Sequence, residues 1–256
     1  MIKLESYEVM GWEHAIRGMR NPMNSWEKND SRYLSCYEGN MNSGDVICNR
    51  CGEVKSDKYL IGQNDHSLMM KLRNAGTDHR KFMRMITVYV DITAPLYWWK
   101  EFDTYKVGTV ANSCSTMHKI AEKEFTLEDF SCEHLIEPMT IKPTICDVLG
   151  KDSIPIVDVS PYHDAKIIFS PKGWLEGTIR MLNECRNWYL ETNDKKYWWQ
   201  MIQLLPSSYN QKRTVMLNYE VLANIYKSRK NHKLNEWVDF CRWIETLPYS
   251  EIITGE

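Results

Sequence analysis

The stretch MITVYVDITAPLY occupies residues 85–97 of the chain. Apolar β-branched residues stand at every second position from 86 to 92, a period of two that is typical of a half-buried strand. We expect Ala94 and Pro95 to end this strand, because proline cannot donate a hydrogen bond to a neighbouring strand. Residues 96–106 then predict a helix, which breaks near Gly108.

Four further helices are expected from the spacing of apolar residues and from capping or breaking residues, at about 64–76, 173–205, 214–228 and 234–246. Asn64 and Asp65 are the predicted N-cap of the first, and Leu205-Pro206 ends the second. A strand region combined with these helices predicts an α+β fold class, with helices packed on a sheet.

The bulk composition limits the function classes. Of the 256 residues 43% are hydrophobic and 26% are charged, which indicates a globular chain rather than a disordered one. The net charge of −2 supplies no long-range positive field, so a nucleic-acid partner is not expected, although a local basic patch could still form. We find no signal peptide and no membrane-spanning apolar run, and therefore expect a cytoplasmic protein without a membrane partner.

The eight cysteines raise the question of a metal site. Cys48 and Cys51 form a C-x-x-C pair, Cys36 lies upstream, and a zinc site would need a fourth ligand such as His66. Because the sequence has no second C-x-x-C, a zinc site and an unliganded loop both stay open. The surrounding residues 29–58 are polar and predict a long loop or insertion.

Three features resemble the flavin-dependent thymidylate synthase (ThyX) family. The strand that ends at Ala94-Pro95 leads into a helix, as in that family. Leu205-Pro206 is followed by Asn218, and the segment from Asn218 carries Asn224 and ends at Arg229, which again matches the family's pattern. The order of the elements also agrees.

This resemblance implies a ThyX-like fold with a central, mostly antiparallel sheet and packed helices. It implies one domain over residues 1–256, to which residues 29–58 and a proline-rich excursion at 137–173 are additions.

The family's signature motif, R-H-R-x-x-S-x-N-E-x-S-x-R-Y, aligns over residues 104–117 without a single identical signature position. Four replacements keep a property of the family residue: Lys106, Thr109, Asn112 and Cys114. Thr116 replaces an arginine, and Ile202 stands where the family has another. Arginine is the side chain best suited to bind a phosphate, so the replaced motif predicts weakened phosphate binding.

In the ThyX family, reduced FAD supplies a hydride for the conversion of dUMP to dTMP, and methylene-tetrahydrofolate supplies the carbon, at sites built from several subunits of a tetramer. The resemblance implies ligand or nucleotide contacts by Lys106, Thr109, Asn112, Ser115 and Arg229. It implies contacts to a cofactor, with FAD as the candidate, by Tyr105, Asn218 and Asn224. It also implies a homo-oligomer, expected to be a tetramer.

The segment 218–229 is polar on two sides when it is drawn as a helix. Asn218 and Arg229 share one face, whereas Glu220 and Asn224 lie on nearly the opposite face. Glu220 replaces a family arginine, and its charge would repel the phosphates of a cofactor. The ordinary structural role of Arg229 would be to complement a helix dipole.

Three functions stay open on the sequence. The leading hypothesis is a ThyX-like homo-oligomer that binds a nucleotide or flavin-like ligand between subunits and is degenerate for dTMP synthesis. The second is an active, divergent FAD-dependent thymidylate synthase. The third is a non-enzymatic protein that sequesters a nucleotide or serves as an interaction module.

Overall fold

The computed structural model describes residues 2–33, 59–136, 139–141 and 167–255. The chain divides into two compact units, of which the first comprises residues 1–94, 98–113 and 212–256 and the second comprises residues 95–97 and 114–211. Most of the stretches 29–58 and 137–173 lie outside the described residues, and so do Cys36, Cys48 and Cys51. The expectation of a single domain over residues 1–256 stays a prediction.

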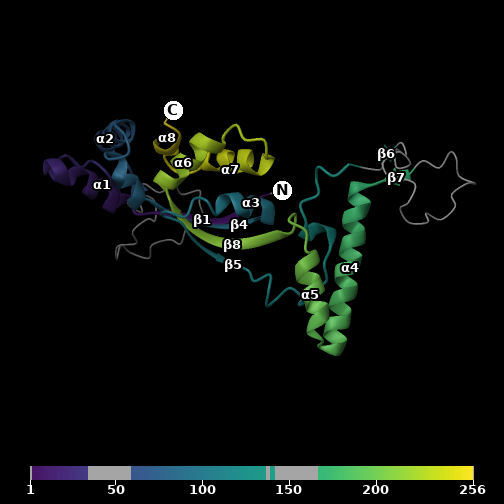
Figure 1. Ribbon diagram of the computed structural model, residues 1–256. Coiled ribbons are helices and arrows are strands. Elements are labelled where there is room, and N and C mark those ends of the chain that lie inside the picture. Colours follow the sequence, from purple (N-terminus) through teal and green to yellow (C-terminus); the bar gives the residue numbers. More distant parts are fainter. Residues whose placement is uncertain (1, 34–58, 137–138, 142–166, 256) are drawn as a thin grey trace, which may run out of the picture. The chain divides into compact units, whose positions relative to one another are not determined.

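The first unit is built on a four-stranded sheet (Figure 1). Its strands, in spatial order, are β1 (Lys3–Met10), β4 (Thr87–Pro95), β8 (Asn210–Asn218) and β5 (Val110–Ser113). The β1–β4 and β5–β8 pairs are antiparallel. Hydrogen bonds from Tyr219 N to Ile86 O and from Leu96 N to Tyr209 O, at opposite ends, show that β4 and β8 are antiparallel as well. The predicted antiparallel sheet is therefore confirmed.

Strand β4 has the alternation that the sequence predicts. Val88, Val90 and Ile92 are fully buried, whereas Tyr89 between them is exposed. The strand begins at Thr87 rather than Met85, and it includes both Ala94 and Pro95, the residues expected to end it. The helix that follows, α3 (Leu96–Phe102), is shorter than the predicted 96–106.

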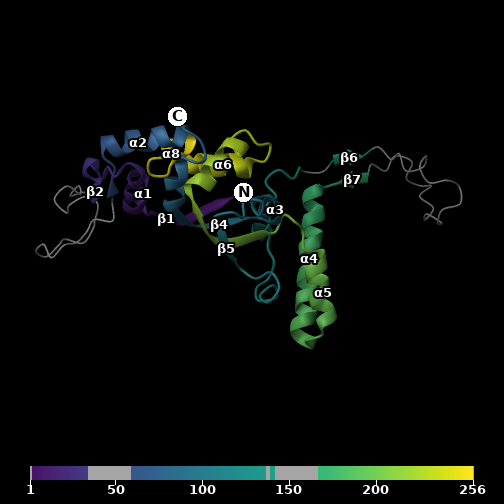
Figure 2. The same cartoon turned by 60° about the vertical axis from the view of Figure 1, so that its left-hand side comes forward.

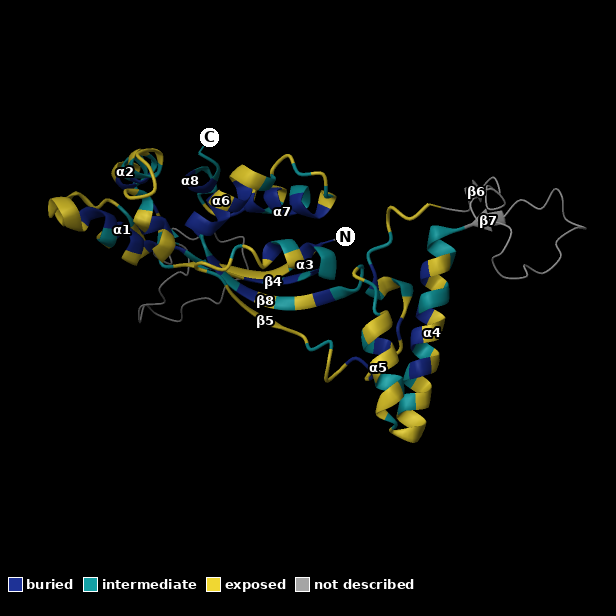
Figure 3. Cartoon of the chain, viewed as in Figure 1, coloured by how far each residue is buried: buried dark blue, intermediate teal, exposed yellow. Residues whose placement is uncertain are grey.

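Helices α3, α6 (Tyr219–Arg229), α7 (Asn235–Glu245) and α8 (Glu251–Thr254) gather on one side of the sheet (Figures 1 and 2). The core between them is aromatic. Trp98 lies with its ring centroid 4.7 Å from that of Trp237 and 5.0 Å from that of Phe102. Figure 3 shows the inward sides of these helices buried, and aromatic burial of this kind contributes much of a core's stability.

The prediction of a helix over 214–228 is wrong at its start, because β8 continues to Asn218. Val215 and Leu217 are both buried, a period of two that belongs to a strand. Asn218 then caps α6, since its side-chain oxygen accepts a hydrogen bond of 3.0 Å from Val221 N. Asn218 is thus not a member of a helix face, which corrects its placement beside Arg229.

The N-terminal part of the first unit contains α1 (Trp12–Arg20), α2 (Gln63–Asn74), the 3₁₀ helices η1 (Asn21–Met23), η2 (Trp26–Lys28) and η3 (Arg80–Met85), and the short strands β2 (Arg32–Tyr33) and β3 (Tyr59–Leu60). The prediction that Asn64 or Asp65 caps α2 is wrong, because Gly62 is the N-cap. The carboxylate of Asp30 instead accepts from Asn64 N and Asp65 N. A distant residue therefore satisfies donors that a local cap would have satisfied.

The second unit contains a helical hairpin of α4 (Pro171–Thr192) and α5 (Lys195–Leu204), with η4 (Leu127–Asp129) and the strand pair β6 (Met139–Ile141) and β7 (Ile167–Phe169). The predicted apolar stripe of α4 is buried, at Leu175, Ile179 and Leu182. The helical run is not continuous to Leu205, because Asn193 adopts a left-handed conformation with φ of 52° and Asp194 caps α5. Within the described ranges, no helix combines the length and apolarity of a membrane span.

Candidate functional site

Arg229, the predicted nucleotide ligand at the end of α6, is held by several groups of its own chain. Its Nη1 lies 3.0 Å from Glu101 Oε2, and its Nε donates a 3.0 Å hydrogen bond to the hydroxyl of Tyr105. Its guanidinium carbon also lies 4.8 Å from the ring centroid of Trp237. Charge, hydrogen bond and cation–π contact together fix the side chain in this position.

Glu101 is the centre of this cluster. Besides Arg229, its Oε2 accepts a 2.9 Å hydrogen bond from Trp237 Nε1 and lies 3.7 Å from His232 Nε2. Tyr105 packs edge-on against Trp237 and is only half-buried. A ligand that binds Arg229 would have to compete with Glu101, so the ligand roles of Arg229 and Tyr105 stay predictions.

The loop between α3 and β5 holds two more predicted residues. Lys106 is exposed and forms no ion pair with the described residues. The hydroxyl of Thr109 is buried and has no hydrogen-bond partner in the described part of the chain. Gly108 adopts a φ of 79°, and its carbonyl is 3.5 Å from Asn218 Nδ2, which joins this loop to the start of α6.

Asn112 and Ser115 lie in different units. Asn112 is exposed on β5, opposite Thr214 of β8. Ser115 belongs to the second unit, where its Oγ accepts hydrogen bonds from Met117 N at 3.2 Å and His118 N at 2.9 Å. That pattern shapes a turn, and the ligand roles of both residues stay predictions.

Glu220 and Asn224 share a face of α6, as helical geometry predicts, and Arg80 of η3 binds both. Arg80 Nε lies 3.3 Å from Glu220 Oε1, and its Nη2 donates to Asn224 Oδ1 over 3.1 Å. Arg84 also pairs with the Glu220 carboxylate, and this hydrogen bond and charge raise the pKa of Arg84. Glu220 is therefore compensated by two arginines.

Asn224 lies on the wall of a pocket of about 400 Å³. It is lined by residues of α2, η3, α6 and α8 and of the turns that follow α2 and α6: Arg73, Asn74, Gly76, Arg80, Ala223, Asn224, Tyr226, Lys227, Lys230, Ile253 and Thr254. Four of these side chains are cationic, and among the described residues no carboxylate belongs to the lining. We call this cavity the basic pocket.

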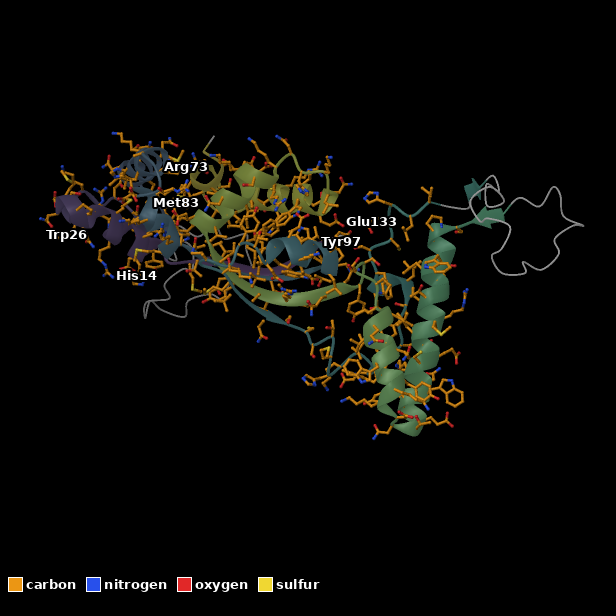
Figure 4. The ribbon with its side chains drawn as sticks, in the orientation of Figure 1. His14, Trp26, Arg73, Met83, Tyr97 and Glu133 are labelled. Carbon is orange, nitrogen blue, oxygen red and sulfur yellow. The ribbon has the colours of Figure 1, made fainter. Side chains whose placement is uncertain are left out.

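Arg73 shows how the cations are held there (labelled in Figure 4). Its Nε and Nη2 donate to the backbone oxygens of Ile252 and Ile253 at 3.2 Å and 2.9 Å. Burial lowers the pKa of Arg73, and the nearby charge of Arg80 lowers it further. The second effect is a repulsion between like charges, which an anion in the pocket would relieve.

Negative partial and full charges also lie beside the cations of the basic pocket. The C-terminal ends of α2 and α6 each contribute about half a negative charge, and these partial charges stabilise nearby cations. Glu220 adds one full negative charge beside Arg80. Four cations line the pocket and, among the described residues, no carboxylate does, so the lining is cationic and suits an anion.

Sequence reasoning did not find this pocket. Arg73 and Arg80 come from different elements than Lys227 and Lys230, and only tertiary packing brings the two pairs together. The spacing of Lys227 and Lys230 at i and i+3 near a helix end is the one local signal, and it equally fits dipole complementation.

Within the described ranges, no group of three or more His, Cys, Asp or Glu side chains could hold a metal ion. His66, the suggested fourth zinc ligand, lies 2.8 Å from Glu251 Oε1. The three cysteines of the proposed zinc site lie outside the described residues, so zinc binding stays an open prediction.

The fold can be compared with known proteins. No protein-family model matches the sequence, and no curated protein matches it. Solved structures do match. The structure of Thymidylate Synthase X (ThyX) from Helicobacter pylori with FAD and dUMP has a TM-score of 0.57 and 14% identity, with 98% of this chain and 96% of that chain covered.

A second match is the UMP/dUMP methylase PolB from Streptomyces cacaoi bound with 5-Br UMP, with a TM-score of 0.52, 12% identity, and coverage of 100% of this chain and 94% of that chain. Both similarities extend over nearly the whole chain, and at this identity they establish the fold. The chain has a ThyX-like α+β fold, which confirms the fold predicted from the sequence.

Proposed function

We propose that the protein binds a nucleotide or flavin-like ligand whose phosphate occupies the basic pocket beside α6. The observation that carries this proposal is a lining of four cations, without a carboxylate among the described residues, next to the amide of Asn224. The ThyX-like fold supports it, because the matched structures of that fold contain dUMP, FAD or a brominated UMP.

The lining has the donors that a phosphate requires. Guanidinium groups of Arg73 and Arg80 can present paired N–H donors to phosphate oxygens, and Lys227 and Lys230 supply compact positive charges. The Asn224 amide adds a donor that could bind a base or sugar oxygen. The same residues would hold the diphosphate if FAD binds, and the bound flavin would then supply hydride chemistry.

We further propose that this protein is degenerate for the conversion of dUMP to dTMP and that it forms a homo-oligomer with the ligand between subunits. The replacements at Thr116 and Ile202 support the first point, because arginines are missing at both positions. An active thymidylate synthase is the alternative. It requires flavin in the purified protein and rescue of a thymidine-requiring bacterium.

The test of ligand binding is calorimetric titration of the purified full chain with dUMP, FAD and deoxyuridine, preceded by an absorbance spectrum. We expect dUMP or FAD to bind and phosphate-free deoxyuridine to bind much more weakly. The double variant Lys227→Ala/Lys230→Ala should lose about tenfold or more in affinity, because two attractive charges are removed from the pocket.

The matched control is Lys71→Ala/Lys212→Ala, which removes two cations of the same unit that do not line the pocket. It should keep the wild-type affinity. Binding that the control weakens as much as the pocket variant would reflect general charge attraction and would contradict the proposal.

A further inference from the structure

Arg80 belongs both to the basic pocket and to an ion pair behind it. It lines the cavity, while its Nε lies 3.3 Å from the carboxylate of Glu220. Glu220 itself is buried, with 9% of its surface exposed, and does not line the cavity. This guanidinium of the pocket lining therefore already has an anionic partner.

Glu220 has a second cation that is independent of the pocket. Arg84 pairs with its Oε2, does not line the cavity, and has a side chain that is 54% exposed. The folded state is strongly destabilised when a buried carboxylate loses its only cationic partner. Because Arg84 would keep Glu220 compensated, Arg80 can turn toward a new anion at low cost.

The bond between Arg80 and Asn224 favours the same exchange. Arg80 Nη2 donates to Asn224 Oδ1 at 3.1 Å, on the pocket wall. This bond keeps the guanidinium next to the cavity, and it uses a nitrogen other than the one nearest Glu220. A rotation of the planar guanidinium, which moves Nε and Nη2 together, would present its N–H donors to a ligand.

We propose that Glu220 is an internal counter-ion of Arg80, displaced from it when the phosphate monoester of a ligand enters the basic pocket. This inference rests on the proposed function and names the class of ligand. A phosphate dianion offers Arg80 more charge than the single charge of the Glu220 carboxylate. A neutral nucleoside carries no negative charge and a phosphodiester carries only one. The exchange therefore favours phosphate monoesters.

The test is titration of the full-length protein with inorganic phosphate and with dUMP, using deoxyuridine as the uncharged probe. We expect Glu220→Gln to bind both phosphate probes about three- to tenfold more tightly than wild type, because a competing charge is removed. Binding of deoxyuridine should be unchanged. Asp103→Asn, which removes a negative charge from a different ion pair of the same unit, is the control.

A double-mutant cycle separates partner exchange from simple repulsion through space. If Glu220 acts through Arg80, the gain from Glu220→Gln disappears in an Arg80→Ala background. A gain that persists undiminished there would overturn the exchange. Thermal unfolding verifies that each variant is folded, and Glu220→Asp, which keeps the charge, should show a smaller gain or none.

The outcomes also separate this inference from the proposed function. Wild-type binding of phosphate or dUMP together with an unchanged or weaker affinity in Glu220→Gln would overturn only the inference. If neither wild type nor Glu220→Gln bound any phosphate probe, the proposed function would fail, and the inference with it.

Discussion

Arg20 and Asp65 form a buried ion pair that joins α1 to α2, with Arg20 Nε 2.7 Å from Asp65 Oδ1 and the two residues only 4% and 0% exposed. The other carboxylate oxygen accepts hydrogen bonds from the hydroxyl and backbone N of Ser31. This carboxylate therefore holds three separate segments of the first unit together.

We expect Asp65→Asn to lower the free energy of unfolding by about 3–5 kcal/mol, because it leaves Arg20 as a buried charge without its counter-ion. Urea denaturation measures this loss. The control is Asp239→Asn, which breaks an exposed pair with Arg242 and should change stability by only about 0–1 kcal/mol. Equal effects of the two substitutions would show that the burial of the pair has no consequence.

Alkaline pH should destabilise the fold through Cys241. Burial raises the pKa of this thiol to about 12, and the charge of Glu245 adds to the effect. Because folding favours the protonated thiol, its contribution is complete below the ordinary value of 9.0 and is lost as the pH rises toward 12. Burial also raises the pKa of Tyr219, so both groups act in the same direction.

Urea midpoints measured from pH 8 to pH 11 should therefore fall more steeply for wild type than for Cys241→Ala. In the native state, Cys241 should also resist alkylation near neutral pH, whereas the exposed Cys114 should react. Rapid modification of Cys241 in the folded protein would contradict this expectation.

The loop that leads into β5 depends on Gly108. Its φ of 79° favours glycine, and a Cβ atom there would lie 2.8 Å from Asn218 Nδ2, at the cap of α6. We expect Gly108→Ala to cost about 1–3 kcal/mol of stability, measured by chemical denaturation.

Gly177 provides the matched comparison, because it lies inside α4 and a Cβ there would meet only the flexible end of Arg180 at 3.8 Å. Gly177→Ala should stabilise the protein by about 0.5–1 kcal/mol. The two glycine-to-alanine substitutions should thus change the free energy of unfolding in opposite directions. A loss of stability at both positions would refute this account of the loop.

Arg229 should matter for stability whether or not it contacts a ligand. We expect Arg229→Ala to lower the free energy of unfolding by about 1–3 kcal/mol, because it removes a cation–π contact with Trp237 and leaves Glu101 without its nearest cation. Titration of the same variant with dUMP tests the predicted ligand role separately. A stable variant with weaker dUMP binding would assign Arg229 to the ligand rather than to the fold.

Several elements of this fold could be predicted because their signals are local. The alternation from Ile86 to Ile92 predicted a strand, and the apolar spacing of Leu175, Ile179 and Leu182 predicted the buried stripe of α4. Such patterns reflect the periods of strand and helix, which are properties of a single segment. The α+β fold class followed from these elements, whereas their boundaries did not.

The predictions failed where a residue distant in the sequence makes the hydrogen bonds that a neighbouring residue was expected to make. Asp30 supplies the acceptors at the start of α2, so Asp65 is free to pair with Arg20 instead of capping its own helix. Residues 213–216 pair with β5 and therefore belong to a strand, although that strand directly precedes a helix.

By itself, the sequence determined the fold class, the order of most elements and the resemblance of the α6 segment to a ligand-binding helix. Only the tertiary structure decided which side chains meet there. From the sequence alone, the negative charge of Glu220 is expected to repel a phosphate. In the structure this charge is paired with Arg80 and Arg84, which lie about 140 residues away along the chain. Tertiary packing also brings Arg73 into one pocket with Lys227 and Lys230. The charge of a site is a sum over neighbours in space, and distance along the chain does not reveal that sum.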